Sequence, residues 1–316
     1  MKYIILGVML LCMNHVTAQD KVRLKEKFDF DWKFILDDKK EYAQKSFIDT
    51  HWENIQVPHD WSIKLKFDKS VGGASAFIPG GIGWYRKSFT VPTSYQDKKV
   101  SIMHHSDVYI IGHHLGFHPY GYSSIEYDLT PYLKFYEENV IAVRVDRTGK
   151  SARWYTGSGI YRHVWLQVVN PIHVSTYGTY ITTPSVSIEK ADVKIVTTLK
   201  NDDVKEQNVS VSHRVLNTSG KEIAKSKVGK IILNRNDSTN IEQSFSLSKP
   251  ELWSIETPVL YTMETTVKVG NKVVDVYATP FGVRTIKFDK DKGFFLNGKH
   301  IKLKGLCLHQ DAGSMG

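Results

Sequence analysis

The sequence VIAVRVDR at residues 140–147 places apolar and polar side chains in alternation from Ile141 onward. Successive residues of an extended strand point to opposite faces of a sheet, so a period of two is typical of a half-buried β-strand. The same alternation returns in VLYTMETTV at residues 259–267. Only residues 38–54, rich in Lys, Glu, Ala and Gln and free of Gly and Pro, favour a short helix. The sequence therefore predicts a mainly β protein.

The composition and net charge of the chain limit the classes of function that it can have. Hydrophobic residues make up 41% of the 316 residues and charged residues 24%, which is enough apolar surface for a packed core and argues against a disordered chain. The net charge is +9 at pH 7. Lysines stand next to acidic residues, as in residues 21–27 and 37–41, and no run of five basic residues occurs. Nucleic-acid-binding proteins concentrate their positive charge, so we expect no nucleic-acid partner.

The first 18 residues have the pattern of an export signal. Lys2 is followed by an apolar stretch, residues 4–13, that is too short to span a bilayer, and then by the small-residue sequence Val-Thr-Ala at 16–18. We expect cleavage before Gln19 and a periplasmic or secreted mature protein with no membrane partner. Mass spectrometry of the exported chain would show whether it starts at Gln19.

The two cysteines add a constraint. Cys12 lies within the signal, so Cys307 stands alone in the mature chain and no intrachain disulfide is expected. A lipid anchor at Cys12 stays an alternative, although bulky Leu11 precedes it where such sites carry a small residue.

Composition changes twice along the chain. Six of the seven Trp residues and nine of the 13 His residues precede Asn170-Pro171, whereas the next segment consists of short alternating stretches of Ser, Thr, Val and Lys with polar turns. This pattern, over roughly 100 residues, is typical of an immunoglobulin-like sandwich. An Asn297-Gly298 hairpin signal and a short apolar stretch at 301–308 come last. We expect a site-bearing module over 19–170, the sandwich over 171–283 and a third segment over 284–316.

Nine short motifs stand in one order along the chain: FDWKF at 30–34, FIDTHW at 47–52, VPHDWSI at 57–63, PGGIGWYRK at 79–87, SDVYI at 106–110, RWY at 153–155, GIYRHVWL at 159–166, FGVR at 281–284 and LKG at 303–305. In this order they resemble glycoside hydrolase family 2, and within it the β-galactosidase-like members. The resemblance implies a jelly-roll sugar-binding domain over 19–170, an immunoglobulin-like β-sandwich over 171–283, and the first strand of a truncated (β/α)8 catalytic barrel within 284–316.

The resemblance also implies an activity. It is that of a secreted retaining exo-glycosidase acting on terminal β-galactosides, with a β-galactoside-terminated glycan as partner and no cofactor. A non-catalytic carbohydrate-binding or structural β-sandwich module is the alternative. The sequence does not decide the oligomeric state, and a homo-oligomer of the complete enzyme stays open.

In this family the acid/base and nucleophile are two glutamates on later barrel strands, about 5 Å apart. A barrel takes about 250 residues, and only residues 284–316 are left for it here. By the resemblance both catalytic carboxylates are absent, so we assign no catalytic residue. We expect a fragment of a longer gene product or a reading frame that ends early. The first barrel strand should then be unpaired, with its apolar side chains exposed.

Five residues are candidates for substrate contact. His309 and Asp311 end the expected first barrel strand, and in the family this end faces the substrate. Arg153, Trp154 and Tyr155 precede a Gly-rich turn, where aromatic rings can stack on a sugar and polar groups can fix its hydroxyls. A site-facing loop and a core position are about equally compatible with these last three residues.

Other conspicuous residues favour structural roles. His59-Asp60 has no serine or cysteine in a strained elbow to complete a hydrolase triad, so we interpret it as a loop pinned by hydrogen bonds. Trp84 is interpreted as a core residue. The histidines within 104–118 show no fixed ligand spacing, so we assign no metal. At Ile111-Gly112, where the family usually has Asn-Gly, the turn requires positive φ, which a β-branched residue tolerates poorly.

Overall fold

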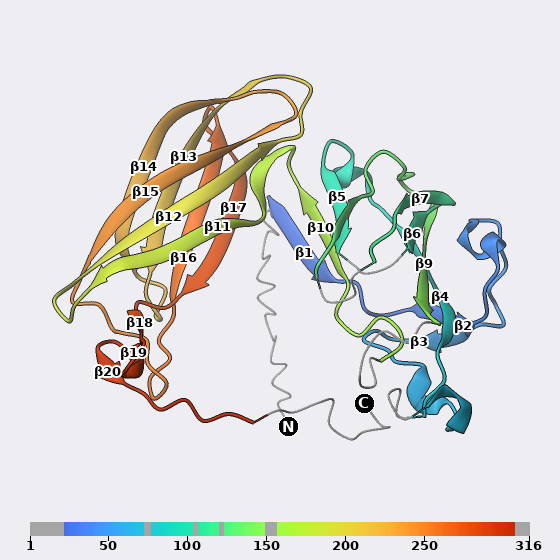
Figure 1. The fold of residues 1–316 in the computed structure, drawn as a ribbon. Helices are drawn as coiled ribbons and strands as arrows, with labels where there is room; N and C mark the ends of the chain where they lie inside the picture. Colours follow the sequence, from blue (N-terminus) through green and yellow to red (C-terminus); the bar gives the residue numbers. More distant parts are fainter. Residues whose placement is uncertain (1–21, 73–76, 104–106, 120–122, 149–156, 307–316) are drawn as a thin grey trace, which may run out of the picture.

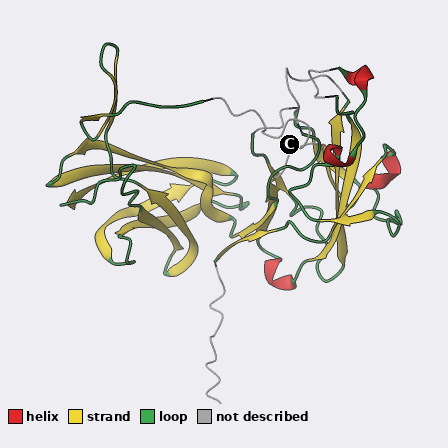
Figure 2. Ribbon diagram, turned by 90° about the horizontal axis from the view of Figure 1, so that it is seen from below, coloured by secondary structure: helices red, strands yellow, loops and turns green. Residues whose placement is uncertain are grey.

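The computed structural model describes residues 22–72, 77–103, 107–119, 123–148 and 157–306. This part of the chain forms two β-sandwiches, followed by a small three-stranded sheet next to the second (Figure 1). The helical turns all belong to the first sandwich (Figure 2), and they are η1 Lys40–Ala43, η2 Ser62–Lys64, η3 Lys69–Val71 and η5 Thr93–Tyr95. Among the described residues no helix is long and apolar enough to cross a membrane. The mainly β fold is confirmed.

The first sandwich packs a four-stranded sheet, β1-β10-β5-β8, against a six-stranded sheet, β3-β2-β4-β9-β6-β7. The strands are β1 Arg23–Lys27, β2 Trp32–Leu36, β3 Glu53–Ile55, β4 Gly81–Thr90, β5 Lys99–Met103, β6 Asp107–Ile110, β7 His113–Gly116, β8 Glu126–Asp128, β9 Glu138–Arg147 and β10 Trp165–Val169. All neighbouring strands are antiparallel. The chain's first strand therefore pairs with the last strand of this sandwich.

The alternation along β4 and β9 separates two layers of side chains. Tyr85, Ile141 and Val143 belong to the main apolar core between the sheets. Trp84 and Ala142 point to the opposite face, as adjacent residues of a strand must, and form a smaller cluster there. The Trp84 side chain is only 2% exposed. Trp84 is thus a core residue as predicted, but it packs outside the six-stranded sheet rather than between the two sheets.

The segment 38–54 forms no α-helix, and η1 is its only helical turn. The reason is Arg86, which is 2% exposed and donates hydrogen bonds to the backbone carbonyls of Tyr42, Gln44 and Phe47. Those carbonyls would accept the i→i+4 hydrogen bonds of a helix. Tertiary contacts thus outweigh the helical propensity of this segment, and the expectation of a short α-helix was wrong.

The second sandwich packs β11-β12-β15 against β14-β13-β16-β17. Its strands are β11 Ile172–Val186, β12 Lys190–Asn201, β13 Gln207–Leu216, β14 Glu222–Leu233, β15 Asp237–Ser248, β16 Tyr261–Val269 and β17 Lys272–Phe281. In β16 the predicted alternation holds, because Tyr261, Met263, Thr265 and Val267 are buried and the residues between them are partly exposed. The apolar side chains fill two clusters between the sheets.

A buried histidine makes the second sandwich sensitive to pH. His213 is 1% exposed, and its Nε2 lies 3.0 Å from the hydroxyl of Thr197. Burial lowers the pKa of His213 from 6.5 to about 4. Between pH 6.5 and about 4, His213 is therefore protonated in the unfolded chain and neutral in the folded chain. The free energy of unfolding thus falls as the pH falls.

We expect the free energy of unfolding to drop by about 2 kcal/mol between pH 7 and pH 5 on account of His213. Urea denaturation followed by far-UV circular dichroism at both pH values measures the drop. The His213→Gln variant, which does not titrate, should lose this share of it, whereas His114→Gln on an exposed position should keep it. An equal drop in the wild type and His213→Gln would contradict the assignment.

The chain continues into β18 Ile286–Asp289, β19 Gly293–Leu296 and β20 Lys299–His300. Asn297 and Gly298 have φ of 51° and 75° and join β19 to β20, which confirms the predicted two-residue hairpin. The Ile301 amide donates to the carbonyl of Phe294 at 2.9 Å, and residues 302–306 form no strand within the described chain. The side chains of Leu303 and Leu306 are 67% and 86% exposed.

The turn at Ile111-Gly112 joins β6 to β7 with φ of 49° and 83°. Both residues are in the left-handed region that the sequence predicted for this turn. A β-branched residue in that conformation is strained by roughly 1–2 kcal/mol. The strain is held by the surrounding structure, in which the Ile111 amide donates to the carbonyl of Val140 and the side chain packs against the main core.

Candidate sugar-binding site

The five residues predicted to contact the substrate lie outside the described residues. Arg153, Trp154 and Tyr155 fall in the segment 149–156, and His309 and Asp311 fall in 307–316. The structure does describe the chain on both sides of 149–156, at the end of β9 and at Gly157. What it adds to the candidate site is the scaffold that fixes these two ends.

The end of β9 is held against the loop that enters β4. A Cβ atom on Gly80 would lie 1.8 Å from the carbonyl oxygen of Arg147, so only glycine allows the two segments to pass this closely. Arg147 Nη1 donates to the carbonyl of Ile78 at 3.2 Å. Asp146 Oδ1 accepts from the amide and hydroxyl of Thr148, at 2.9 and 2.8 Å. The segment 149–156 therefore starts from a fixed point.

The other end is pinned by His59 and Asp60. Asp60 Oδ1 accepts from the Ser158 amide at 3.0 Å and from the Ser62 amide and hydroxyl at 2.9 and 2.6 Å. The His59 amide donates to the carbonyl of Ile160 at 2.8 Å. The loop around His59-Asp60 and the chain after Gly157 thus form one hydrogen-bonded unit, which confirms the structural interpretation of this His-Asp pair.

The His59 ring is bound to a buried phenol. Its Nδ1 lies 2.9 Å from the hydroxyl of Tyr85, which is 0% exposed. Burial lowers the pKa of His59 and raises the pKa of Tyr85. Both groups are therefore neutral at pH 7.

A second set of hydrogen bonds that holds the chain after Gly157 was not predicted from the sequence. Asp29, which is 4% exposed, accepts from the Val164 amide at 2.9 Å and pairs with His163 Nδ1 at 2.7 Å. The Phe28 amide also donates to the Val164 carbonyl at 2.8 Å. Asp29 directly precedes the FDWKF motif and lies 135 residues before Val164, so nothing local in the sequence indicates this contact.

The described carboxyl groups whose pKa is shifted do not have the electrostatics of a glycosidase acid. A general acid needs a raised pKa so that it is protonated near neutral pH. Wherever the pKa of a described carboxyl group departs from its ordinary value, it is lowered, chiefly through hydrogen bonds and ion pairs that offset burial. These groups are Asp37, Asp38, Asp49, Asp68, Asp128, Asp146, Asp192, Glu256 and Asp289.

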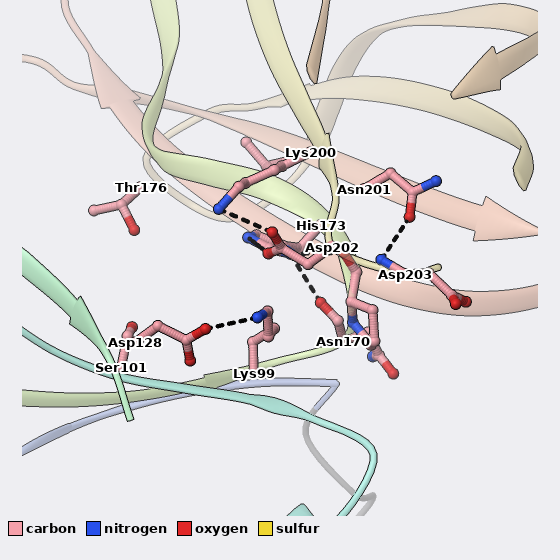
Figure 3. Close-up of polar contacts among 12 residues, drawn as sticks. Lys99, Ser101, Asp128, Asn170, His173, Thr176, Lys200, Asn201, Asp202 and Asp203 are labelled. Atoms are coloured by element: carbon pink, nitrogen blue, oxygen red, sulfur yellow. Dashed lines mark hydrogen bonds and ion pairs between the residues drawn. The ribbon is translucent and has the colours of Figure 1, made fainter. Parts of the chain in front are cut away.

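Where the two sandwiches meet, charged side chains surround a small cavity (Figure 3). Lys99 pairs with Asp128 at 2.7 Å on the first sandwich, and Lys200 pairs with Asp202 at 3.0 Å on the second. His173 closes one wall, and its Nδ1 bonds to the carbonyl of Asn170 at 2.8 Å. The cavity of about 50 Å³ is far below the 300 Å³ or more of usual ligand pockets. It has room for water and not for a sugar.

Beside this cavity a buried ion pair joins the two sandwiches. Asp275 on β17 is fully buried and accepts from Arg23 Nε at 2.9 Å and Nη2 at 2.7 Å. It also accepts from the Val174 amide at 2.8 Å. Arg23 donates further to the Val174 carbonyl at 2.5 Å and lies 4.7 Å from the ring centre of Tyr277. The strand that opens the first sandwich is thus fastened to the second.

Family models account for most of the chain. The sugar-binding domain of glycosyl hydrolases family 2 matches residues 25–170, and a second model of glycosyl hydrolases family 2 matches residues 172–284. The chain belongs to glycoside hydrolase family 2. The jelly-roll and immunoglobulin-like sandwiches expected from the resemblance are the N-terminal domains of this family.

Relatives within family 2 have two activities in their names. The chain is 41% identical to a β-galactosidase of Bacteroides ovatus, over 93% of this chain and 35% of that protein. It is 32% identical to a β-glucuronidase of Formosa agariphila, over 90% of this chain and 32% of that protein. The chain thus spans about a third of the length of these curated relatives.

Solved structures of family 2 agree with the fold. A member from Bacteroides cellulosilyticus superposes with a TM-score of 0.83 at 34% identity, covering 89% of this chain and 38% of that one. A β-glucuronidase of Bacteroides uniformis gives 0.82 at 31% identity, covering 93% and 36%. Among the described residues of this family 2 chain, no group of three or more His, Cys, Asp or Glu side chains has the arrangement of a metal site.

Proposed function

We propose that this chain provides the N-terminal, sugar-contacting part of a secreted, retaining exo-glycosidase that acts on terminal β-galactosides. The observation that carries the proposal is the scaffold on both sides of 149–156 in a family 2 chain. Fixed ends position a short segment far better than a free loop, and accurate positioning of substrate is a large part of catalysis. Arg153, Trp154 and Tyr155 would then bind the sugar, together with His309 and Asp311.

The choice of β-galactoside is supported by the 41% identity to the Bacteroides ovatus β-galactosidase. The β-glucuronidases among the relatives make glucuronide the competing substrate. A glucuronide differs from a galactoside in the configuration at C4 and in carrying a carboxylate at C6, and the carboxylate requires a cationic partner in the pocket. Comparing the two nitrophenyl substrates therefore tests the specificity directly.

A polypeptide of these 316 residues is expected to show no hydrolysis of nitrophenyl-β-galactoside above background. General acid catalysis alone is worth about 10² to 10⁴ in rate. The described carboxyl groups with shifted pKa values have lowered values, so at neutral pH they are ionised and have no proton to donate. Release of nitrophenol measures the rate. Turnover that survives removal of host galactosidase, and is lost in His309→Ala or Asp311→Ala, would contradict this expectation.

The positive test adds a catalytic barrel to the chain. The chain is mixed with, or fused to, the catalytic barrel of the Bacteroides ovatus relative. We expect the assembled enzyme to hydrolyse the galactoside at least about tenfold faster than the glucuronide, because the wrong substrate leaves a buried polar group of the pocket without its hydrogen-bond partner. Faster hydrolysis of the glucuronide would overturn the substrate, and no hydrolysis of either would favour a non-catalytic module.

A further inference from the structure

A cavity of about 440 Å³ lies on the outer face of the six-stranded sheet, over the ends of β4, β6 and β9. Its apolar surface includes Trp84 and Tyr109, whose rings stack with centroids 5.6 Å apart and an interplanar angle of 27°. A volume of this size is in the usual range of pockets for small ligands.

The polar side of the cavity is rigid. Arg144 donates to Asp38 twice, from Nε at 2.9 Å and from Nη2 at 2.8 Å. The indole Nε1 of Trp84 donates to the same carboxylate at 2.9 Å. A carboxylate that accepts three hydrogen bonds has one orientation, and it fixes the guanidinium with it. The arrangement is therefore ready for a ligand without reordering of side chains.

On this side of the cavity, one hydrogen-bond donor and one acceptor lie at a separation that a hydroxyl group of a ligand can bridge. Arg144 Nη1 lies 3.8 Å from Asp107 Oδ2, which is too far for a direct hydrogen bond. The other Asp107 oxygen is occupied by His114 Nε2 at 3.0 Å. A hydroxyl placed between the two groups can accept from the guanidinium and donate to the carboxylate at once. An ion can do only one of the two.

The charges on the wall also balance. Asp38 and Asp107 face Lys40 and Arg144 around the cavity, with the amide of Gln44 beside them. An anionic ligand would meet the two carboxylates, and a cationic ligand would meet the ammonium and the guanidinium. A neutral molecule with several hydroxyl groups satisfies all of them.

We propose that this cavity binds a neutral sugar unit, such as a galactosyl unit of the glycan on which the enzyme acts. The inference rests on the proposed function for the identity of the glycan, and on the cavity itself for the neutral, hydroxyl-rich character of the ligand. Binding here holds the glycan on the first sandwich at a second point, which raises its local concentration for the reacting end.

The test titrates the purified chain with lactose and records the indole N–H resonance of Trp84 by NMR. Because that N–H donates to Asp38, a sugar in the cavity shifts its resonance, and we expect a dissociation constant of about 1 mM. Asp107→Ala and Gln44→Ala should each weaken binding by about tenfold. Asp192→Ala, which removes a carboxylate paired with Lys190 on the second sandwich, is the matched control and should bind lactose as the wild type does.

Three results would overturn the proposal: an indole resonance that lactose does not move, lactose binding unchanged in both cavity variants, or sodium glucuronate binding as tightly as lactose. Thermal unfolding of each variant shows whether it is folded. Because the two cavity variants lie on different chain segments, the test can still be read if one of them fails to fold. Hydrolysis of the small nitrophenyl substrate by the assembled enzyme is measured separately from lactose binding to the chain. Failure of the cavity and failure of the proposed function are therefore separate results.

Discussion

Replacement of Gly159 by alanine is expected to lower the free energy of unfolding by at least about 4 kcal/mol. The new Cβ atom would lie 2.3 Å from the carbonyl oxygen of His59 and 2.5 Å from the hydroxyl of Tyr85. Neither can withdraw, because the His59 backbone is hydrogen-bonded to Ile160 and the Tyr85 ring is fully buried. The φ of +136° at Gly159 adds strain for any other residue.

Urea denaturation followed by tryptophan fluorescence measures this loss, because six of the seven tryptophans precede residue 170. The control is Gly72→Ala, where φ is +80° and no atom lies within 4 Å of the added Cβ. With ψ of 163° it should cost about 1–3 kcal/mol, from the backbone conformation alone. If the two variants were equally stable, the loop at His59 would not approach Gly159 as closely as described. In the assembled enzyme, the loss at Gly159 should also appear as reduced activity.

The second large effect is expected at Asp275. Its replacement by alanine should lower the free energy of unfolding by about 3–5 kcal/mol, because it leaves the Arg23 guanidinium buried without its carboxylate. The Val174 amide loses its acceptor at the same time. Scanning calorimetry should show the lower stability in both sandwiches, since the ion pair spans them.

An exposed pair provides the comparison. Arg214 and Glu264 also make two hydrogen bonds, at 2.6 and 3.0 Å, but on the surface of the second sandwich. Glu264→Ala should cost less than about 1 kcal/mol. The double variant Arg23→Met with Asp275→Leu should recover most of the loss, since it removes both buried charges. A loss at Asp275 no larger than at Glu264 would count against a fastening role.

The sequence could predict those structural features whose signal lies within a few neighbouring residues. Period-two alternation identified β9 and β16, and Asn297-Gly298 identified a hairpin, because both signals are complete within a few residues. The helix expected in 38–54 failed because Arg86, some forty residues away, takes the carbonyls that a helix needs. For the same reason the pins at Asp29 and Asp60 and the Arg23–Asp275 pair could not be found, since each joins positions about a hundred or more residues apart.

The Asp38–Arg144 cavity was missed for a related reason. Its charged residues come from the segment around η1, from β6 and from β9, and of these only Asp107 belongs to a motif of the family, SDVYI. Only the register of β4, β6 and β9 brings them together, with Arg144 opposite Trp84 on one side and Asp107 on the other. A single sequence contains no signal for such a register.

The fastening of Arg23 to Asp275 has a consequence for biosynthesis. The two residues are 252 positions apart. A ribosome that adds about 5–20 residues per second takes on the order of 10 to 50 s to make the second after the first. During that interval the N-terminal strand has no ion-pair partner and, for more than half of it, no β10 to pair with. The nascent chain therefore remains open at its N-terminal end until most of both sandwiches has been synthesised.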